Sequence, residues 1–294
     1  MDREQAARLD EQLPDRDWTE LAEGAVASTF DAPSGPLAVI SLGDPGNPRI
    51  LLVPGVTGSK EDFTLMMPGL AEAGYYVQSY DLAGQYESYR AGPENLAPPL
   101  RHYEYELFID DMIALLGAGG GPSHVLGYSF AGNVAQATFL RRPELFASLT
   151  LLSAPPEPGQ GFRGVKRIGP YTGLANGRIG AFFMILGLSW NVTHVPPGRQ
   201  AFVEHRFSLT RRPAVRDIIN LMMRAPDART ELRASPIPKL VAVGEHDLWP
   251  LELHARFAEE IGARMAVYRT GHSPCETTPN QLTVDMLELF TRVA

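Results

Sequence analysis

Residues 123 to 132 read Ser123-His124-Val125-Leu126-Gly127-Tyr128-Ser129-Phe130-Ala131-Gly132, an apolar run that ends in small residues around one serine. The run predicts a buried strand, and the residues after it predict the start of a helix. A chain that turns sharply from strand to helix crowds its own backbone, so only small side chains fit at Gly127 and Ala131. Ser129, at the apex, is expected to adopt a strained backbone conformation that lifts its hydroxyl into the open. This is the geometry of a nucleophile elbow.

The bulk composition limits the classes of protein to which the chain can belong. With 294 residues, of which 44% are hydrophobic, it can form one large α/β domain or a core domain with an insertion. The formal net charge is -8 and no run of Lys or Arg stands out. A nucleic acid or an anionic membrane is therefore not an expected partner.

The cysteine content and the N-terminus indicate a cytoplasmic protein. The single cysteine, Cys275, cannot form an internal disulfide and fits a reducing compartment. The first residues are polar and contain no apolar signal-peptide core. The longest apolar stretch, 181–188, is too short to span a bilayer.

Strand-like segments alternate with helical ones along most of the chain, which predicts a mainly parallel sheet with helices on both faces. The first two strands, 26–30 and 37–42, are separated by a turn and are expected to pair antiparallel. The further strands are expected at 50–53, 75–80, 123–128, 149–152, 239–243 and 264–268. Helices are expected at 60–73, 103–116, from the elbow to 141, at 251–261 and at 279–293, after a polar helix and connector in 1–23.

The alternation is interrupted in the middle of the chain. From Pro155 to about Ser235, apolar helical pieces alternate with Pro and Gly breaks, and no buried strand is evident. We therefore predict a core domain formed by residues 1–154 and 236–294. Residues 155–235, called the insertion below, are predicted to form a helical cap.

Three predicted strands end in residues that form a Ser-His-Asp set. Ser129 follows the strand at 123–128, Asp247 follows the strand at 239–243, and His272 follows the strand at 264–268. Because ligands bind beyond the carboxyl ends of parallel strands, these side chains are expected to meet there. A serine hydroxyl needs a base within hydrogen-bond reach, and that base needs a carboxylate to orient it. The sequence therefore predicts a catalytic triad of Ser129, His272 and Asp247.

Each member of this set has alternatives. A lone serine more often caps a helix, and it is the two partners that favour catalysis for Ser129. Glu245 and Asp111 are rival acids, but Glu245 is expected to be an exposed loop carboxylate and Asp111 lies mid-helix. Of the histidines, only His272 follows the last predicted strand. The others are expected to lie at the surface or in the cap (His102, His194, His205, His254), at the start of the elbow strand (His124) or beside the acid (His246).

Four motifs together resemble the α/β-hydrolase superfamily, in its serine esterase and thioesterase-like form. They are Pro54-Gly55-Val56-Thr57-Gly58, Gly127-Tyr128-Ser129-Phe130-Ala131-Gly132, Gly244-Glu245-His246-Asp247 and Thr270-Gly271-His272-Ser273. The order Ser, Asp, His along the chain is also that of this family. The resemblance covers the chain from about residue 25 to its end and places the insertion where the family carries its cap.

The resemblance implies an oxyanion hole. One donor would be the backbone N–H of Phe130, and the other that of Val56, with Thr57 as second choice. The chain departs from the family in having Pro54 where histidine is frequent and Ala131 where glycine is commoner. Both departures leave room for the expected loop and elbow.

The substrate pocket is expected to be apolar. Candidate wall residues lie in the apolar part of the insertion and beside the proposed acid and nucleophile. They are Phe182, Phe183, Trp190, Leu248, Trp249 and Tyr128. Packing onto the core domain is the alternative role for the side chains of the insertion.

The sequence predicts neither a metal nor a cofactor. No two histidines lie at a ligand-like spacing, and one cysteine cannot build a thiolate cluster. The glycine-rich segment 117–121 precedes a strand and lacks a following Lys-Ser/Thr, so a flexible loop is favoured over a phosphate cradle. A small-molecule substrate with an apolar portion is the expected partner, and the oligomeric state is not indicated.

These observations favour a cofactor-independent serine hydrolase that cleaves a carboxylic ester, thioester or lactone through an acyl-enzyme. The alternative is the same triad used by an acyltransferase, a cyclase or a lyase of a biosynthetic pathway. A ligand receptor that has kept the fold is the least favoured hypothesis. An epoxide hydrolase or dehalogenase of this fold would carry aspartate where this chain has Ser129.

Overall fold

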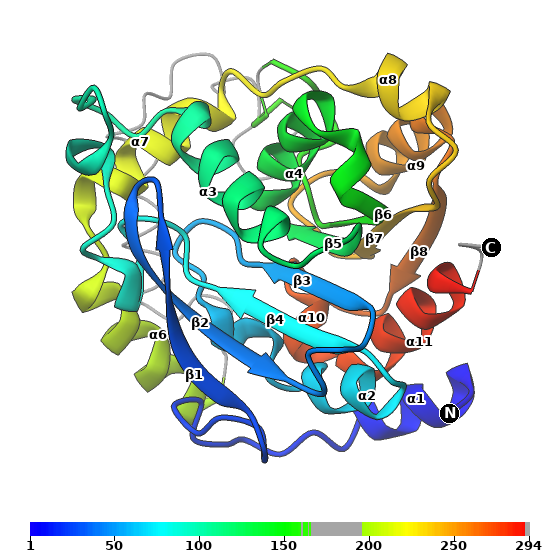
Figure 1. Cartoon of the computed structure of the whole chain (residues 1–294). Helices are drawn as coiled ribbons and strands as arrows, with labels where there is room; N and C mark the ends of the chain where they lie inside the picture. Colours follow the sequence, from blue (N-terminus) through cyan, green and yellow to red (C-terminus); the bar gives the residue numbers. More distant parts are fainter. Residues whose placement is uncertain (160, 164, 166–195, 292–294) are drawn as a thin grey trace.

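A computed structural model of the protein describes residues 1–159, 161–163, 165 and 196–291. Within these residues, eight strands form one sheet in the order β1-β2-β4-β3-β5-β6-β7-β8 (Figure 1). The strands are β1 (Val26–Ala32), β2 (Gly35–Leu42), β3 (Arg49–Val53), β4 (Tyr76–Tyr80), β5 (Ser123–Tyr128), β6 (Phe146–Leu152), β7 (Lys239–Gly244) and β8 (Arg264–Tyr268).

The sheet is parallel except at one edge. β1 pairs antiparallel with β2, and β2 pairs antiparallel with β4, whereas β4, β3, β5, β6, β7 and β8 are mutually parallel. The central strands β3, β5 and β7 are buried at every position, as expected for apolar runs covered on both faces. The predicted fold class and the predicted antiparallel first pair are therefore confirmed.

Helices cover both faces of the sheet. One face packs against α3 (Tyr105–Gly117), α4 (Phe130–Arg141) and α9 (Leu251–Ile261). The other packs against α2 (Met67–Glu72), α10 (Pro274–Thr277) and α11 (Pro279–Phe290). The N-terminal helix α1 (Arg3–Asp10) lies beside α11 (Figure 1). Because these strands are parallel, their carboxyl ends lie at the same end of the sheet. The candidate site lies at that end.

One local prediction was wrong, and one short helix was not predicted. The helix expected at 60–73 is a 3₁₀ turn at Lys60–Phe63 followed by α2, which begins only at Met67. Pro68 lacks an N–H group and is tolerated in the first turn of α2 but not in the interior of a longer helix. The short helix α10, just after His272, was not expected from the sequence.

The described part of the insertion contains three helices between β6 and β7. They are α6 (Pro197–Leu209), α7 (Arg212–Met222) and α8 (Arg229–Ala234). Its start meets the segment between α7 and α8 at an antiparallel bridge between Gly159 and Ala225, where each N–H donates to the other carbonyl at 2.8 Å.

Candidate active site

Ser129 lies in the turn between β5 and α4, where the backbone is strained. Its φ is 52° and its ψ is -119°, a region that residues with a side chain rarely adopt. The turn is tight because a Cβ atom on Gly127 would lie 2.5 Å from the carbonyl oxygen of Ala131. Ser129 itself is only 6% exposed, so its hydroxyl faces His272 rather than bulk solvent.

The structure brings Ser129, His272 and Asp247 together. The Ser129 Oγ lies 3.2 Å from Nε2 of His272, and Nδ1 of His272 lies 2.5 Å from Oδ1 of Asp247. These are hydrogen-bond distances for a hydroxyl, an imidazole and a carboxylate in series. The three residues come from the ends of β5, β8 and β7.

The loops that carry Asp247 and His272 are fixed against each other. The N–H of His246 donates to the carbonyl of Thr270 at 2.9 Å. A Cβ atom on Gly244 would lie 1.9 Å from the carbonyl oxygen of Gly271, so the two loops approach as closely as a bare backbone allows. This close approach places the carboxylate beside the imidazole.

Asp247 is held in its ionised form. Burial opposes ionisation, but contacts with His254 and His272 outweigh it, so the pKa of the Asp247 carboxyl is lowered from its ordinary value. The N–H of Leu248 also donates to its Oδ1 at 2.7 Å. A carboxylate, rather than a carboxylic acid, therefore faces His272.

The rival acids lie elsewhere. Asp111 is buried in α3 and accepts hydrogen bonds from the main-chain N–H and hydroxyl of Ser34, at 3.0 and 2.6 Å. Glu245 is 39% exposed and pairs with His246. Neither contacts His272 among the interactions of the described residues.

His254 was wrongly expected at the surface or in the cap. It is fully buried, and its Nε2 lies 2.9 Å from Oδ2 of Asp247. The signal for burial was present, because His254 shares the apolar face of α9 with Phe257, Ala258 and Ile261, at helical spacing.

A loop after β3 approaches Ser129 from the other side. A Cβ atom on Gly55 would lie 2.9 Å from the Ser129 Cβ. Gln85 fixes this loop: its Oε1 accepts the N–H of Thr57 at 2.5 Å and its Nε2 donates to the Gly55 carbonyl at 3.4 Å. Thr57 has a positive φ of 60°. Sequence reasoning gave no role to Gln85.

The two N–H groups expected to form an oxyanion hole remain available. Among the described residues, those of Val56 and Phe130 have no hydrogen-bond partner, whereas that of Thr57 is taken by Gln85. Phe130 is the first residue of α4, so its N–H has no intrahelical acceptor. This arrangement favours Val56 over Thr57 as the second donor.

The candidate wall residues are divided between several environments. Tyr128 is buried, and its hydroxyl lies 2.8 Å from that of Ser273. Trp249 is fully buried, packs its ring against His272, and donates its indole N–H to the Gly161 carbonyl at 2.8 Å. Leu248 is 40% exposed. The other candidates, Phe182, Phe183 and Trp190, lie outside the described residues.

A small apolar cluster lies over the loop after β3. Val215 and Ile219, one turn apart on α7, pack with Val56, Phe162 and Phe207. Because Val56 is a candidate oxyanion donor, this cluster places apolar surface beside the loop that carries it. None of the predicted wall residues lies on α7.

Helix α6 is anchored to the same loop by buried charges. Nη2 of Arg199 and Nη1 of Arg206 lie 2.8 and 2.5 Å from the same oxygen of Asp62, and Arg199 also pairs with Glu276 of α10. Burial opposes ionisation of Asp62, but the two guanidinium groups outweigh it and lower the pKa of its carboxyl. These buried ion pairs thus join α6 of the insertion to the segment after β3 and to α10, the helix after His272.

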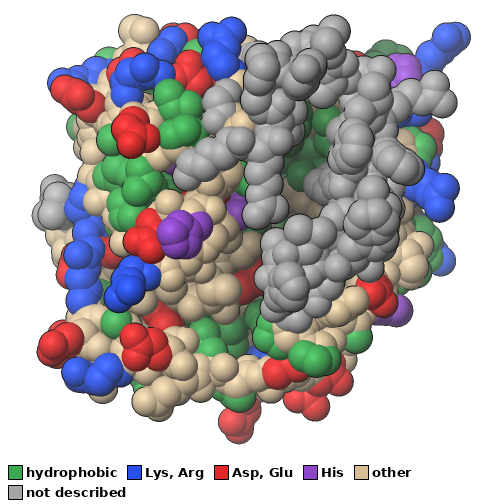
Figure 2. All heavy atoms as spheres, turned by 180° about the vertical axis from the view of Figure 1, so that it is seen from behind, with side chains coloured by type: hydrophobic (Ala, Val, Ile, Leu, Met, Phe, Trp, Pro, Cys, Tyr) green, Lys and Arg blue, Asp and Glu red, His purple; other side chains and the backbone are tan. Residues whose placement is uncertain are grey.

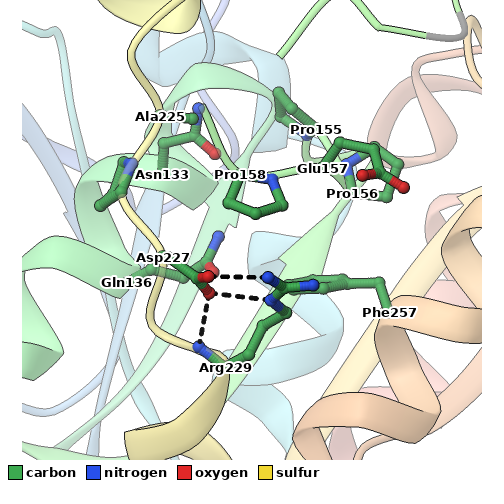
Figure 3. Close-up of a pocket in the computed structure, with 11 residues that line it drawn as sticks. Asn133, Gln136, Pro155, Pro156, Glu157, Pro158, Ala225, Asp227, Arg229 and Phe257 are labelled. Atoms are coloured by element: carbon green, nitrogen blue, oxygen red, sulfur yellow. Dashed lines mark hydrogen bonds and ion pairs between the residues drawn. The ribbon is translucent and has the colours of Figure 1, made fainter. Parts of the chain in front are cut away.

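Two cavities lie away from Ser129. One, of about 10 Å³, lies between α4, α9 and the two ends of the insertion, beside the ion pair of Asp227 and Arg229 (Figure 3). It has room for about one water molecule. The other, of about 520 Å³, lies at the opposite edge of the sheet, where Arg49 donates to the last carbonyls of α3, those of Leu115 and Leu116. Neither is lined by a member of the triad.

Acidic and basic side chains are interspersed over the described surface seen in Figure 2. In the described part of the chain, none of the helices has the length and apolarity needed to cross a membrane. Those same residues contain no group of three or more His, Cys, Asp or Glu side chains that could hold a metal ion.

Comparison with known proteins identifies the fold. A family model described as the alpha/beta hydrolase family matches residues 50–286. No curated protein matches the sequence. A hydrolase from Pseudomonas aeruginosa is 20% identical, with 90% of this chain and 97% of that chain covered and a TM-score of 0.70.

Two further solved structures have different named activities. A thermophilic esterase from Thermogutta terrifontis is 21% identical, with 91% and 99% covered and a TM-score of 0.66. An epoxide hydrolase from Vigna radiata is 15% identical, with 92% and 98% covered and a TM-score of 0.68. At such identities the likeness shows the fold and leaves the reaction open. The family match over most of the chain, together with the strand order, shows that the chain belongs to the alpha/beta hydrolase family.

Proposed function

We propose that the protein is a cofactor-independent serine hydrolase that cleaves a carboxylic ester, thioester or lactone with an apolar portion. The observation that carries this proposal is the series Ser129, His272, Asp247, with Oγ to Nε2 at 3.2 Å and Nδ1 to Oδ1 at 2.5 Å. The lowered pKa of Asp247 supports the carboxylate form that orients the imidazole and stabilises its cation.

The reaction proceeds in two halves. His272 takes the proton of Ser129 as Oγ attacks the acyl carbon, and then gives that proton to the leaving alcohol, thiol or lactone oxygen. The acyl group remains on Ser129. In the second half, His272 takes a proton from water, whose oxygen attacks the acyl-enzyme, and returns it to Ser129 as the acid leaves.

The negative charge of each tetrahedral intermediate falls on the former carbonyl oxygen. The N–H groups of Val56 and Phe130 are proposed to bind it, since both are unpartnered among the described residues and flank Ser129. Removing one such donor typically costs about 10²- to 10³-fold in rate.

The apolar portion of the substrate is proposed to lie under the insertion. Val215, Ile219 and Phe162 supply apolar surface next to Val56. We propose that residues 155–235 act as the cap of the core domain formed by 1–154 and 236–294. The buried contacts of Arg199 and Arg206 with Asp62 support this role.

Opening of an epoxide is not favoured, although one structural neighbour is an epoxide hydrolase. An epoxide hydrolase of this fold would usually carry an aspartate at the nucleophile position. Here that position is a serine with an imidazole at 3.2 Å, a pair suited to acyl transfer.

The test combines a covalent probe with a substrate panel. A fluorophosphonate is expected to label the wild-type protein and to fail on Ser129→Ala, whereas Ser208→Ala, at a serine of α6, labels normally. A panel of p-nitrophenyl esters, thioesters and lactones of increasing chain length then defines the reaction. Absence of labelling would refute the nucleophile. Labelling with transfer to an added alcohol in preference to water would favour the acyltransferase alternative.

A further inference from the structure

The carboxylate of Asp247 contacts two histidines, one on each oxygen. Oδ1 lies 2.5 Å from Nδ1 of His272, and Oδ2 lies 2.9 Å from Nε2 of His254. Among the described residues, these are the two titratable side chains that contact this carboxylate, one from the loop after β8 and one from α9. The triad proposed above uses only the first of them.

The position of one proton follows from the contact with His254. Both side chains are fully buried, so water does not screen the two facing atoms. A carboxylate oxygen and an unprotonated ring nitrogen at 2.9 Å would repel each other, because both are acceptors. With Asp247 ionised, the proton must lie on Nε2 of His254.

Although the two atoms lie 2.9 Å apart, neither has a hydrogen-bond partner among the described residues, so the contact between them is electrostatic. Nδ1 of His254 is also without a hydrogen-bond partner among the described residues. The ring of His254 is fixed instead by packing: Trp249 meets it edge-on at 6.2 Å between ring centres, and the same indole lies 5.9 Å from the ring of His272.

We infer that His254 is a positioning residue for Asp247, an inference that rests on the function proposed above. Its Nε2 lies against Oδ2, and this electrostatic contact opposes rotation of the carboxylate that presents Oδ1 to His272. His254 is too deeply buried to meet substrate, and it acts on the reaction only through Asp247.

Loss of this donor has a defined signature. In His254→Leu, one carboxylate oxygen is left buried and without a donor, and the carboxylate is free to rotate away from His272. We expect kcat to fall by roughly 10- to 100-fold with KM unchanged, because a small displacement of Asp247 misplaces the imidazole that it orients. We also expect the acidic limb of the pH–rate profile, which reports the coupled Asp247–His272 pair, to move to higher pH, because Asp247 loses a contact that lowers the pKa of its carboxyl.

His254→Gln is the rescue variant. The side-chain amide of glutamine can place an N–H where histidine has Nε2, so most of the lost kcat and the original pH profile should return. The matched control is His124→Leu, at a second buried histidine that instead contacts Ser148 at 2.8 Å. Its removal is expected to lower stability without moving the profile.

A measurement on the wild-type protein separates this inference from the proposed function. Long-range ¹H–¹⁵N correlation spectra of ¹⁵N-histidine protein report which ring nitrogen is protonated, and the His254 signals are assigned by their loss in His254→Gln. Protonated Nε2 supports the inference, even if His254→Leu does not fold. An unprotonated Nε2 overturns it, as does a folded His254→Leu with wild-type kcat and pH profile. If fluorophosphonate fails to label the wild type, the proposed hydrolase activity fails, while the tautomer still decides the contact with Asp247.

Discussion

The side-chain oxygen of Gln85 accepts a hydrogen bond from the main-chain N–H of Thr57 at 2.5 Å. The same side chain donates to the carbonyl of Gly55, so it binds the loop on both sides of Val56. This fixes the intervening residue, Val56, whose N–H is the proposed second oxyanion donor. Gln85 is fully buried, and water cannot replace it.

Gln85→Met removes both hydrogen bonds at nearly constant volume. We expect kcat for an ester substrate to fall by about 10- to 100-fold, somewhat less than the loss of an oxyanion donor itself. Stability should fall by about 1–3 kcal/mol, since the Thr57 N–H is left buried. Steady-state kinetics and urea unfolding measure the two effects.

Gln136→Met is the control for Gln85. Gln136 is also buried, but among the described residues its side chain donates only to the carbonyl of Gly132 within α4. It should lose stability without a comparable fall in kcat. Equal falls in kcat for the two variants would contradict a specific role of Gln85.

The elbow depends on the absence of a side chain at Gly127. A Cβ atom there would lie 2.5 Å from the Ala131 carbonyl oxygen and 2.8 Å from the Gly132 Cα. Both are backbone atoms, so relieving the clash would distort the turn itself. Gly127→Ala is therefore expected to lower the melting temperature and to abolish most fluorophosphonate labelling of Ser129.

Gly117→Ala is the matched substitution. Gly117 is the last residue of α3, and nothing lies within 4 Å of the position of its Cβ atom. Alanine should be neutral or slightly stabilising there, because it reduces the entropy of the unfolded chain. A Gly127→Ala variant that labels as fast as Gly117→Ala would show that the elbow can relax.

Sequence patterns predicted those parts of the fold that depend on local, repeated signals. Apolar runs at 50–53 and 239–243 indicated central strands, and polar residues at the strand ends indicated where Ser129, Asp247 and His272 would meet. Strand-then-helix order was enough to predict a parallel sheet, and parallel strands bring their carboxyl ends together.

What the sequence did not reveal depends on contacts between distant segments. Gln85 lies in a long polar loop and meets Thr57 only because the chain folds back over the end of β3. His254 is a different case, because its helical spacing with the buried residues of α9 does indicate burial. One partner of Asp62, Arg206, is 144 residues away, on a helix whose orientation no local pattern specifies.

Asp111 should make stability depend on pH. Burial raises the pKa of its carboxyl to about 7, although hydrogen bonds from Ser34 oppose the rise. A folded pKa above the unfolded value of about 3.9 means that folding binds a proton. The contribution of Asp111 to the free energy of unfolding is therefore fully present below about pH 4 and is lost as the pH rises toward 7.

Asp111→Asn removes this titration and keeps groups that can bind Ser34. Relative to the variant, the wild type should lose on the order of 1.4 kcal/mol of unfolding free energy per pH unit between about pH 4 and 7. Urea unfolding at several pH values measures this, with Asp110→Asn as the exposed-site control. Parallel curves for wild type and Asp111→Asn would refute the prediction.

Ile219 should influence which acyl chains are accepted. It is 4% exposed on α7 and packs in the apolar cluster that includes Val56 and Phe162. Ile219→Ala removes part of this wall and enlarges the space beside it, so the preferred chain length of p-nitrophenyl esters should increase. The free energy of unfolding should fall by about 2–5 kcal/mol. Ile109→Ala, at a buried isoleucine of α3, should lose stability and keep the wild-type preference. An unchanged preference in Ile219→Ala would place the acyl chain elsewhere.

Asp62 should be critical for holding α6 against the core domain. One of its oxygens pairs with both Arg199 and Arg206, and all three side chains are nearly fully buried. Removing one partner of a buried ion pair leaves charge without compensation, at a cost of about 3–5 kcal/mol. We expect this loss in Asp62→Asn, together with faster proteolysis within the insertion.

The stabilising contribution of Asp62 should also depend on pH, and its direction follows from the pKa of the carboxyl. Because the folded pKa of Asp62 is lowered, its contribution is present above the unfolded pKa and is lost as the pH falls through the folded value. Wild type and Asp62→Asn should therefore converge in stability in acid. Glu94→Gln, which breaks an exposed pair with Arg211, should cost only about 0–1 kcal/mol. If Asp62→Asn costs no more than Glu94→Gln at neutral pH, the buried charges do not anchor the insertion.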